Sequence, residues 1–192
     1  MHPPALFLAS TSPRRRELLQ QLGLVFSVLR VDVDESANVG ERPTEYVLRL
    51  AREKAQAGLA QITDGVIVAA DTSVVIDDDV LGKPASEAEA VAMWQRLSGR
   101  THQVLTGVAV GDASHIESIV VSTRVHFRAI TPSEMHAYWQ SGEPSDKAGG
   151  YAIQGRGAVF VDAIEGSYSN VVGLPLTETA VLLAHFGIRI LG

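Results

Sequence analysis

Two charged residues stand at positions where the neighbouring sequence is apolar. Asp71 interrupts the run VIVAADTSVVI, which predicts that its carboxylate is at least half buried. Lys54 lies within the apolar stripe of a predicted helix, four residues after Leu50. Burying an ionised group costs free energy unless it pairs with an opposite charge or coordinates a metal. Judged alone, each residue has an equally good structural explanation, as a strand-end aspartate that accepts hydrogen bonds or a lysine that extends along the edge of the stripe.

Three consecutive arginines, Arg14, Arg15 and Arg16, follow the predicted start of a helix. Ser12 suits the N-cap position and Pro13 the first helical position. Cations in the first turn of a helix are unfavourable by ~0.3–1 kcal/mol each. A bound anion would offset that cost, because helix N-terminal N–H groups bind phosphate and guanidinium groups clamp it. The arrangement therefore predicts an anion site at this helix start.

Further charged residues lie in predicted loops. Lys83 and Lys147 stand beside proline or glycine, where side chains can be aimed at a ligand, although each alone reads as a solvated surface charge. Asp32, Asp34 and Glu35 form an acidic cluster that could bind a hard divalent cation or form a solvated loop, and the solvated loop is favoured for the first two.

Motifs for several other chemistries are absent. GYAIQGRG has the glycine spacing of a phosphate loop but lacks Lys followed by Ser or Thr, so it is not a Walker A site. Neither G-x-S-x-G nor H-E-x-x-H occurs, and the histidines show no ligand spacing, which predicts structural or surface roles for residues such as His102. Arginines, lysines, carboxylates and a glycine-rich segment together suit a polyphosphate bridged by a metal ion.

Alternating strands and helices must position these residues in the first half of the chain. A strand is predicted over residues 5–10, a second within 25–36 that runs into an acidic loop, and a third within 65–80 that is followed by an acidic turn. A hairpin is predicted over 102–130, with its turn near Gly111. Helices are predicted over residues 13–22, 43–62, 86–99, 131–142 and 174–187. Residues 143–161 are glycine-rich and too irregular to assign before a final strand. A mixed-sheet α/β architecture follows.

Length and composition narrow the class of protein. The chain has 192 residues, 46% hydrophobic and 20% charged, which predicts one globular domain over residues 1–192. The formal net charge of −6 disfavours nucleic acid and anionic membranes as partners. The sequence contains no cysteine, no apolar run of the ~18 residues that a membrane span needs, and no pattern typical of a signal peptide, so a cytoplasmic location is expected.

Seven segments follow one another in a fixed order along the chain. They are LASTSPRRRELL, LAREKA, AADTSVV, LGKPAS, LSGRTHQVLTGVAV, EPSDKAGGYAIQGRGAVFV and IEGSYSNVVGLPL. Together they resemble the Maf family of nucleoside triphosphate pyrophosphatases. The resemblance implies an elongated, twisted mixed sheet flanked by helices, with a cleft between two lobes as in inosine triphosphate pyrophosphatases. It also implies hydrolysis between the α and β phosphates, a divalent cation such as Mg or Mn, and a homodimer.

The resemblance implies roles for particular residues. Asp71 would be the general base for the attacking water, and Glu35 would help to hold the metal with it. Lys54 and Lys83 would bind phosphates. Further substrate contacts are expected from Ser10, Arg14, Arg15 and Lys147, whereas Arg16 lies outside the family motif and is expected to face solvent.

Base preference in the family bears on Arg14, Thr72 and Gln154, whose ADT and IQG contexts resemble the branch that prefers dTTP and UTP. A primary amide offers one acceptor and two donors, which matches the N3–H donor and flanking carbonyl acceptors of uracil or thymine. A pyrophosphatase acting on 7-methyl-GTP, a nucleotide-responsive regulator of septum formation, and a phosphatase that releases one phosphate remain alternatives.

Overall fold

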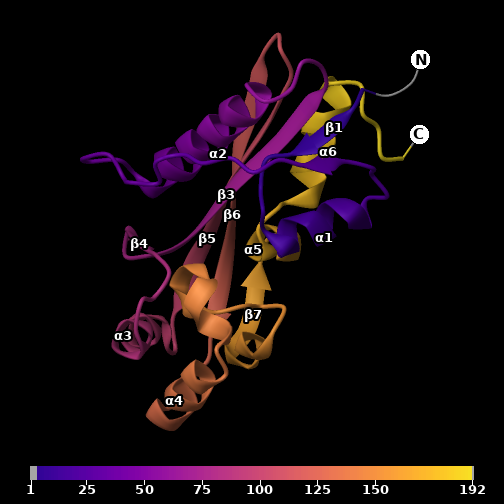
Figure 1. Ribbon diagram of the computed structural model, residues 1–192. Helices are drawn as coiled ribbons and strands as arrows, with labels where there is room; N and C mark the ends of the chain where they lie inside the picture. Colours follow the sequence, from indigo (N-terminus) through magenta and orange to yellow (C-terminus); the bar gives the residue numbers. More distant parts are fainter. Residues whose placement is uncertain (1–3, 192) are drawn as a thin grey trace. The chain divides into compact units, whose positions relative to one another are not determined.

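A mixed sheet of seven strands carries the fold of the computed structural model, which describes residues 4–191 (Figure 1). The strands are β1 Leu6–Leu8, β2 Ser27–Val28, β3 Val66–Ile76, β4 Asp79–Leu81, β5 Thr101–Gly111, β6 Ile116–Phe127 and β7 Val161–Glu165. Their order is β2-β1-β3-β5-β6-β7, and β4 pairs with β3. Strand β1 runs parallel to β2 and β3, whereas β4 and β7 run antiparallel to β3 and β6. The predicted mixed α/β class is confirmed.

The five predicted helices are present as α1 Pro13–Gln21, α2 Pro43–Leu59, α3 Glu87–Leu97, α4 Pro132–Gln140 and α6 Leu176–His185, and the structure adds a short helix, α5 Tyr168–Val172. Three of the predicted helices begin at the expected capping residue. Ser12, Ser86 and Thr131 each accept a hydrogen bond from the backbone N–H three residues later, which satisfies a donor at the helix start. Within residues 4–191, no helix is long and apolar enough to cross a membrane.

One local expectation is wrong, and two features add to the prediction. The strand predicted within residues 25–36 is confined to Ser27–Val28, because Val28 pairs with Leu8, the last residue of β1. Helix α5 was not predicted, since its five residues are too few for a helical pattern to emerge. The irregular segment 143–161 contains three short 3₁₀ turns, Glu143–Asp146, Ala148–Gly150 and Arg156–Phe160.

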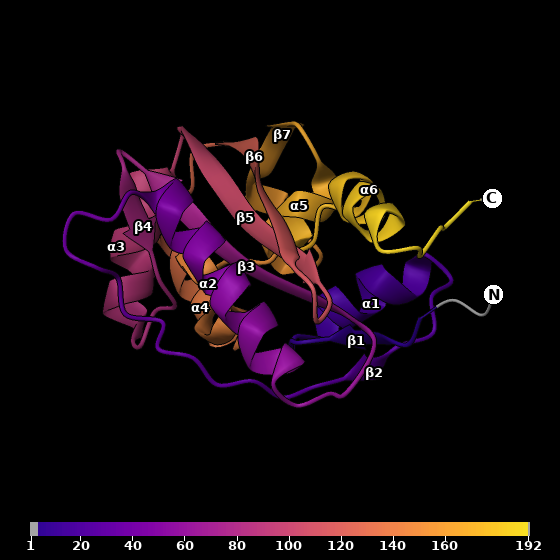
Figure 2. The same ribbon diagram turned by 90° about the horizontal axis from the view of Figure 1, so that it is seen from above.

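The chain divides into two compact units. The first unit comprises Met1–Asp71, Thr106–Val121 and Gly173–Gly192. In it, α2 lies on one side of the strands, and α1 and α6 lie on the other (Figure 2). Helix α2 approaches so closely that a Cβ at Gly107 would lie 2.2 Å from the carbonyl oxygen of Val47, so this position requires glycine. The small residues Ala51 and Ala55 complete the contact of α2 with the sheet.

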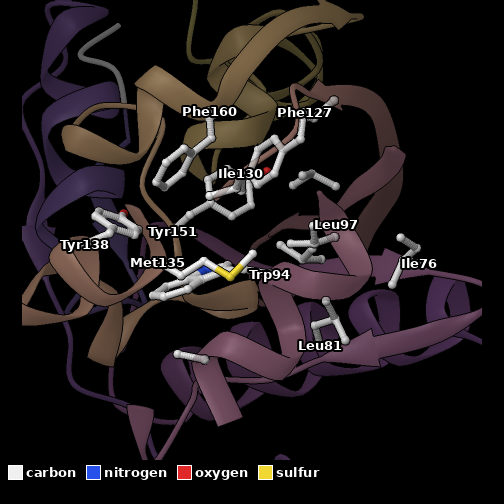
Figure 3. Packing of buried hydrophobic residues seen from close by; sticks show 14 residues of the cluster. Ile76, Leu81, Trp94, Leu97, Phe127, Ile130, Met135, Tyr138, Tyr151 and Phe160 are labelled. Carbon is white, nitrogen blue, oxygen red and sulfur yellow. The ribbon is translucent and has the colours of Figure 1, made fainter. Parts of the chain in front are cut away.

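The second unit comprises Thr72–Leu105 and Ser122–Val172 and has an aromatic core. Trp94, Tyr138 and Phe160 pack together, with ring centroids 5.2 Å apart for Trp94 and Tyr138 and 5.1 Å apart for Tyr138 and Phe160. Figure 3 shows these rings together with Phe127 and Tyr151. This buried cluster joins α3, α4 and the glycine-rich segment, because the rings of Trp94, Tyr138 and Phe160 come from these elements.

Candidate active site

Lys54, Asp71 and Glu35 form one ion-paired group in the first unit. The Lys54 ammonium lies 2.7 Å from Asp71 Oδ1 and 2.6 Å from Glu35 Oε1. The side chains of Lys54 and Asp71 are each 12% exposed, and that of Glu35 is 53% exposed. The two charged residues that interrupt apolar patterns therefore neutralise each other in the fold, as the cost of burying a lone charge requires.

Local structure explains why these three groups meet. Lys54 extends the buried face of α2 that includes Val47, Leu50, Ala51 and Ala55, so its side chain points toward the sheet. Asp71 is the sixth residue of β3, within a strand that is buried along nearly its whole length. The predicted burial of Asp71 is thus confirmed, at 8% exposure for the whole residue.

The acidic loop that carries Glu35 is attached to α2 by backbone contacts. The Tyr46 hydroxyl donates a hydrogen bond to the backbone oxygen of Glu35 at 2.8 Å. The Arg49 guanidinium donates to the backbone oxygen of Ser36 at 3.0 Å and to the carboxylate of Glu41. Neither Tyr46 nor Arg49 was expected from the sequence to support the site, because their contacts depend on how the loop returns to the helix.

Two carboxylates and one ammonium leave this group with a net negative charge. Among the residues that the structure describes, no set of three His, Cys, Asp or Glu side chains is placed to hold a metal ion. Asp71 and Glu35 nevertheless converge on one cation, the Lys54 ammonium. Magnesium commonly takes one or two protein carboxylates and completes its shell with substrate phosphates and water. The donor set of Asp71 and Glu35 fits that requirement.

Arg15 and Ser10 form a second group in the first unit. Arg15 Nε donates to the backbone oxygen of Gly173 at 2.8 Å, and a terminal nitrogen of Arg15 lies 3.4 Å from Ser10 Oγ. Burial and the nearby positive charge of Arg14 lower the pKa of Arg15, whereas the negative charges of Asp71 and Glu35 oppose that effect. The guanidinium is partly buried and already oriented by its hydrogen bonds, which suits it to bind an anion.

The neighbouring arginines differ in exposure. Arg14 is partly buried, and Arg16 is exposed, as predicted for a residue outside the family motif. Of the three arginines, Arg15 is the one that hydrogen-bonds to both Ser10 and Gly173 within residues 4–191.

The candidate residues in the second unit lie on loops and at the start of the unit. Thr72 is partly buried in β3, while Lys83 and Gln154 are exposed. Lys147 pairs with the Asp146 carboxylate and donates to the backbone oxygen of Glu143 at 3.4 Å. The Lys83 and Lys147 loops are linked, because the backbone N–H of Gly149 donates to the oxygen of Gly82 at 2.9 Å.

His102 has a structural position in the second unit, as predicted. It is 2% exposed, and its Nε2 lies 2.7 Å from the Tyr151 hydroxyl. Burial, with a smaller effect from the charge of His126, lowers the pKa of His102 to about 4. Its Nδ1 atom has no hydrogen-bond partner among residues 4–191. The ring is therefore neutral at pH 7, and it packs edge-on against the rings of Phe127 and Tyr151.

Comparisons with known proteins extend along nearly the whole chain. The family profile described as "Maf-like protein" matches residues 5–186. A dTTP/UTP pyrophosphatase of Pseudoalteromonas translucida (strain TAC 125) is 55% identical over 183 residues, which cover 95% of this chain and 97% of the relative. Proteins of the same name from Myxococcus xanthus (strain DK1622) and Vibrio vulnificus (strain YJ016) are each 54% identical, over 95% and 94% of this chain and 93% and 98% of their own lengths.

Proposed function

Because this chain belongs to the Maf family, we propose that it hydrolyses dTTP and UTP between the α and β phosphates, giving a nucleoside monophosphate and pyrophosphate. The observation that carries the proposal is the convergence of the Asp71 and Glu35 carboxylates on the ammonium of Lys54. Water activation beside a polyphosphate needs such a combination of base and cations. The choice of dTTP and UTP is supported by the names of relatives at 54% and 55% identity.

In the proposed reaction, water attacks the α-phosphorus in line with the departing pyrophosphate. Asp71 accepts the proton of that water, because an ionised carboxylate offers only acceptor oxygens. Lys54, Lys83 and Arg15 offset the negative charge on the phosphates and on the leaving pyrophosphate. The existing contacts of Arg15 with Ser10 and Gly173 reduce the ordering that substrate binding must impose on its side chain.

Asp71 and Glu35 would hold a divalent cation such as Mg or Mn. When bound, that cation supplies Lewis-acid polarisation of the phosphate oxygens. Lys54 already shows that both carboxylates can share one positive partner.

Base selection is proposed to rest on Arg14, Thr72 and Gln154. The Gln154 amide can accept from N3–H of thymine or uracil and donate to a neighbouring carbonyl, a pattern that cytosine does not match. Lys147 is proposed to contact the substrate as well, once released from its pairing with Asp146.

We also propose that residues 1–192 act as one catalytic domain in a cytoplasmic homodimer, with the nucleotide as ligand and no nucleic acid or membrane partner. The net charge of −6 supports the exclusion of nucleic acid. The family resemblance supports the dimer.

A substrate panel tests the proposal directly. The purified protein is assayed with Mg²⁺ on dTTP, UTP, CTP, GTP and 7-methyl-GTP, and pyrophosphate and orthophosphate are measured separately. Pyrophosphate as the primary product, formed fastest from dTTP and UTP, is expected. Orthophosphate as the primary product would indicate a phosphatase, fastest turnover of 7-methyl-GTP would overturn the substrate class, and tight nucleotide binding without turnover would favour the regulator.

A further inference from the structure

The exposed Gln154 side chain stands on a tight turn, residues 152–157. The backbone N–H of Gly155 donates to the oxygen of Ala152 at 3.2 Å, and that of Ala158 donates to Gly155 at 3.2 Å. Ala152 and Gly157 are buried at the two ends of the turn, and Gln154 lies between them. The direction in which the Gln154 amide points therefore depends on what holds these ends.

Glu143 and Tyr138 hold both ends of the turn. The Glu143 carboxylate accepts hydrogen bonds from the backbone N–H of Arg156 at 2.9 Å and of Gly157 at 3.1 Å. It also accepts from the Tyr138 hydroxyl at 2.6 Å, and that hydroxyl accepts from the N–H of Ala152 at 3.1 Å. One connected network thus fixes the entry and the exit of the turn.

The glycine spacing of QGRG follows from this network. A Cβ at Gly155 would lie 2.3 Å from Glu143 Oε2, and one at Gly157 would lie 2.6 Å from the Tyr138 hydroxyl. At Gly157 the Cβ would also lie 2.9 Å from the backbone oxygen of Ala152, so glycine is needed there, whereas at Gly155 a side chain would push the Glu143 carboxylate away from the turn. Two of the three glycines of GYAIQGRG, Gly155 and Gly157, therefore allow the turn to pack on these two side chains.

Tyr138 connects the network to the buried aromatic core of the second unit. Tyr138 is 5% exposed and packs against the rings of Trp94 and Phe160 (Figure 3). Burial alone would raise the pKa of Glu143, but hydrogen bonds from Tyr138 and the backbone of Arg156 and Gly157 outweigh it, so the pKa lies below its ordinary value. Glu143 consequently keeps its two acceptor oxygens at neutral pH.

We propose that Glu143, supported by Tyr138, is a positioning residue for base selection: it orients the 152–157 turn and thereby the Gln154 amide that reads the pyrimidine. This inference rests on the proposed function, because it assigns a purpose to the turn only if Gln154 contacts the base. A carboxylate is required, since it presents acceptors to three donors and an amide would present an N–H group to at least one of them.

The test compares Glu143→Gln with Glu134→Gln. Glu134 is a control of the same chemistry, because its carboxylate also accepts a backbone N–H and pairs with Arg128, but its hydrogen bonds within residues 4–191 go to Arg128 and Thr131 and not to the turn. For each variant, kcat and KM are measured with UTP, dTTP and CTP, together with the melting temperature. In Glu143→Gln, the preference for UTP over CTP in kcat/KM should fall on the order of ten- to a hundredfold, mainly through KM. Glu134→Gln should have a lower melting temperature than wild type and the same preference for UTP over CTP.

A double variant separates this inference from the proposed function. In a Gln154→Ala background, Glu143→Gln should change the base preference no further, because both substitutions remove the same contact. Two results would overturn the inference and leave the proposed function intact. In the first, the two substitutions reduce the preference for UTP over CTP additively. In the second, Gln154→Ala loses this preference while Glu143→Gln keeps it. No effect of Gln154→Ala would instead count against base reading itself. If Glu143→Gln does not fold, Tyr138→Phe, which deletes only the hydroxyl of the network, is measured in its place with the same expectations.

Discussion

The candidate residues of the two units are held in different ways. In the first unit, Lys54, Asp71 and Glu35 hold one another through their charges, and their side chains come from α2, β3 and a loop. In the second unit, Gln154 is held through its backbone, by hydrogen bonds that Glu143 and Tyr138 make to the ends of its turn.

This difference separates two requirements of the proposed reaction. Charged groups that bind phosphates and a metal must exchange partners when ligands arrive, and mutual ion pairs permit that exchange. A group that distinguishes one base from another must keep its orientation whether or not substrate is bound. Hydrogen bonds to the backbone on both sides of the group fix that orientation.

Asp71→Asn should have the largest effect. The amide keeps the size of the side chain but cannot take a proton from water, so kcat should fall by about 10²- to 10⁴-fold. Nucleotide binding, measured by calorimetry without turnover, should persist, because the cations remain. Asp77→Asn is the matched control, since Asp77 pairs with Arg100 on an exposed turn and has no proposed catalytic role. Retained turnover in Asp71→Asn would remove Asp71 as the base and weaken the distinction between the units.

The pairing of Lys54 with Asp71 shows what the sequence could and could not predict. Each residue was visible as a charge within an apolar pattern, and burial requires that such charges find partners. That they are partners of each other depends on the packing of α2 on β3, which brings together residues 17 positions apart. The pattern therefore predicted the need for a partner but not its identity.

Other features left no pattern in the sequence. Glu143 stands between Gly142 and Pro144 and reads as an ordinary loop charge, because its contacts are to backbone N–H groups whose directions only the folded turn defines. The strand predicted over residues 25–36 failed for a related reason, since alternation reports half-burial but not the presence of a partner strand. Helix boundaries were predicted well because caps act within a few residues.

His102 should make the second unit's core sensitive to acid. Its pKa is about 4 in the fold, against 6.5 for an ordinary histidine, so the unfolded chain takes up the proton first as the pH falls from 6.5 to 4. The contribution of His102 to the free energy of unfolding is therefore fully present above pH 6.5. It decreases as the pH falls, by about 3 kcal/mol at pH 4. His102→Gln, compared with wild type by urea denaturation at several pH values, should remove this part of the slope.

His136→Gln is measured in parallel, because His136 is an exposed histidine that pairs with Glu87 on the surface and lies outside the aromatic core. Equal slopes in wild type and His102→Gln would show that burial of this ring does not govern the acid response.

Lys54→Met should produce a smaller loss of stability, together with a change in the response to metal. The substitution leaves Asp71 and Glu35 without their shared cation, and because Glu35 is half exposed the free energy of unfolding should fall by only about 2 kcal/mol. Lys147→Met is the matched control, since its ammonium pairs with an exposed carboxylate on Asp146 and should contribute less than about 1 kcal/mol. Millimolar Mg²⁺ should raise the melting temperature of Lys54→Met more than that of wild type or Lys147→Met. A divalent cation that binds the folded state stabilises it, and in Lys54→Met this cation no longer competes with the ammonium for the two carboxylates. Equal shifts in all three proteins would mean that Asp71 and Glu35 do not receive the metal, and would confine the exchange of partners in the first unit to the phosphates.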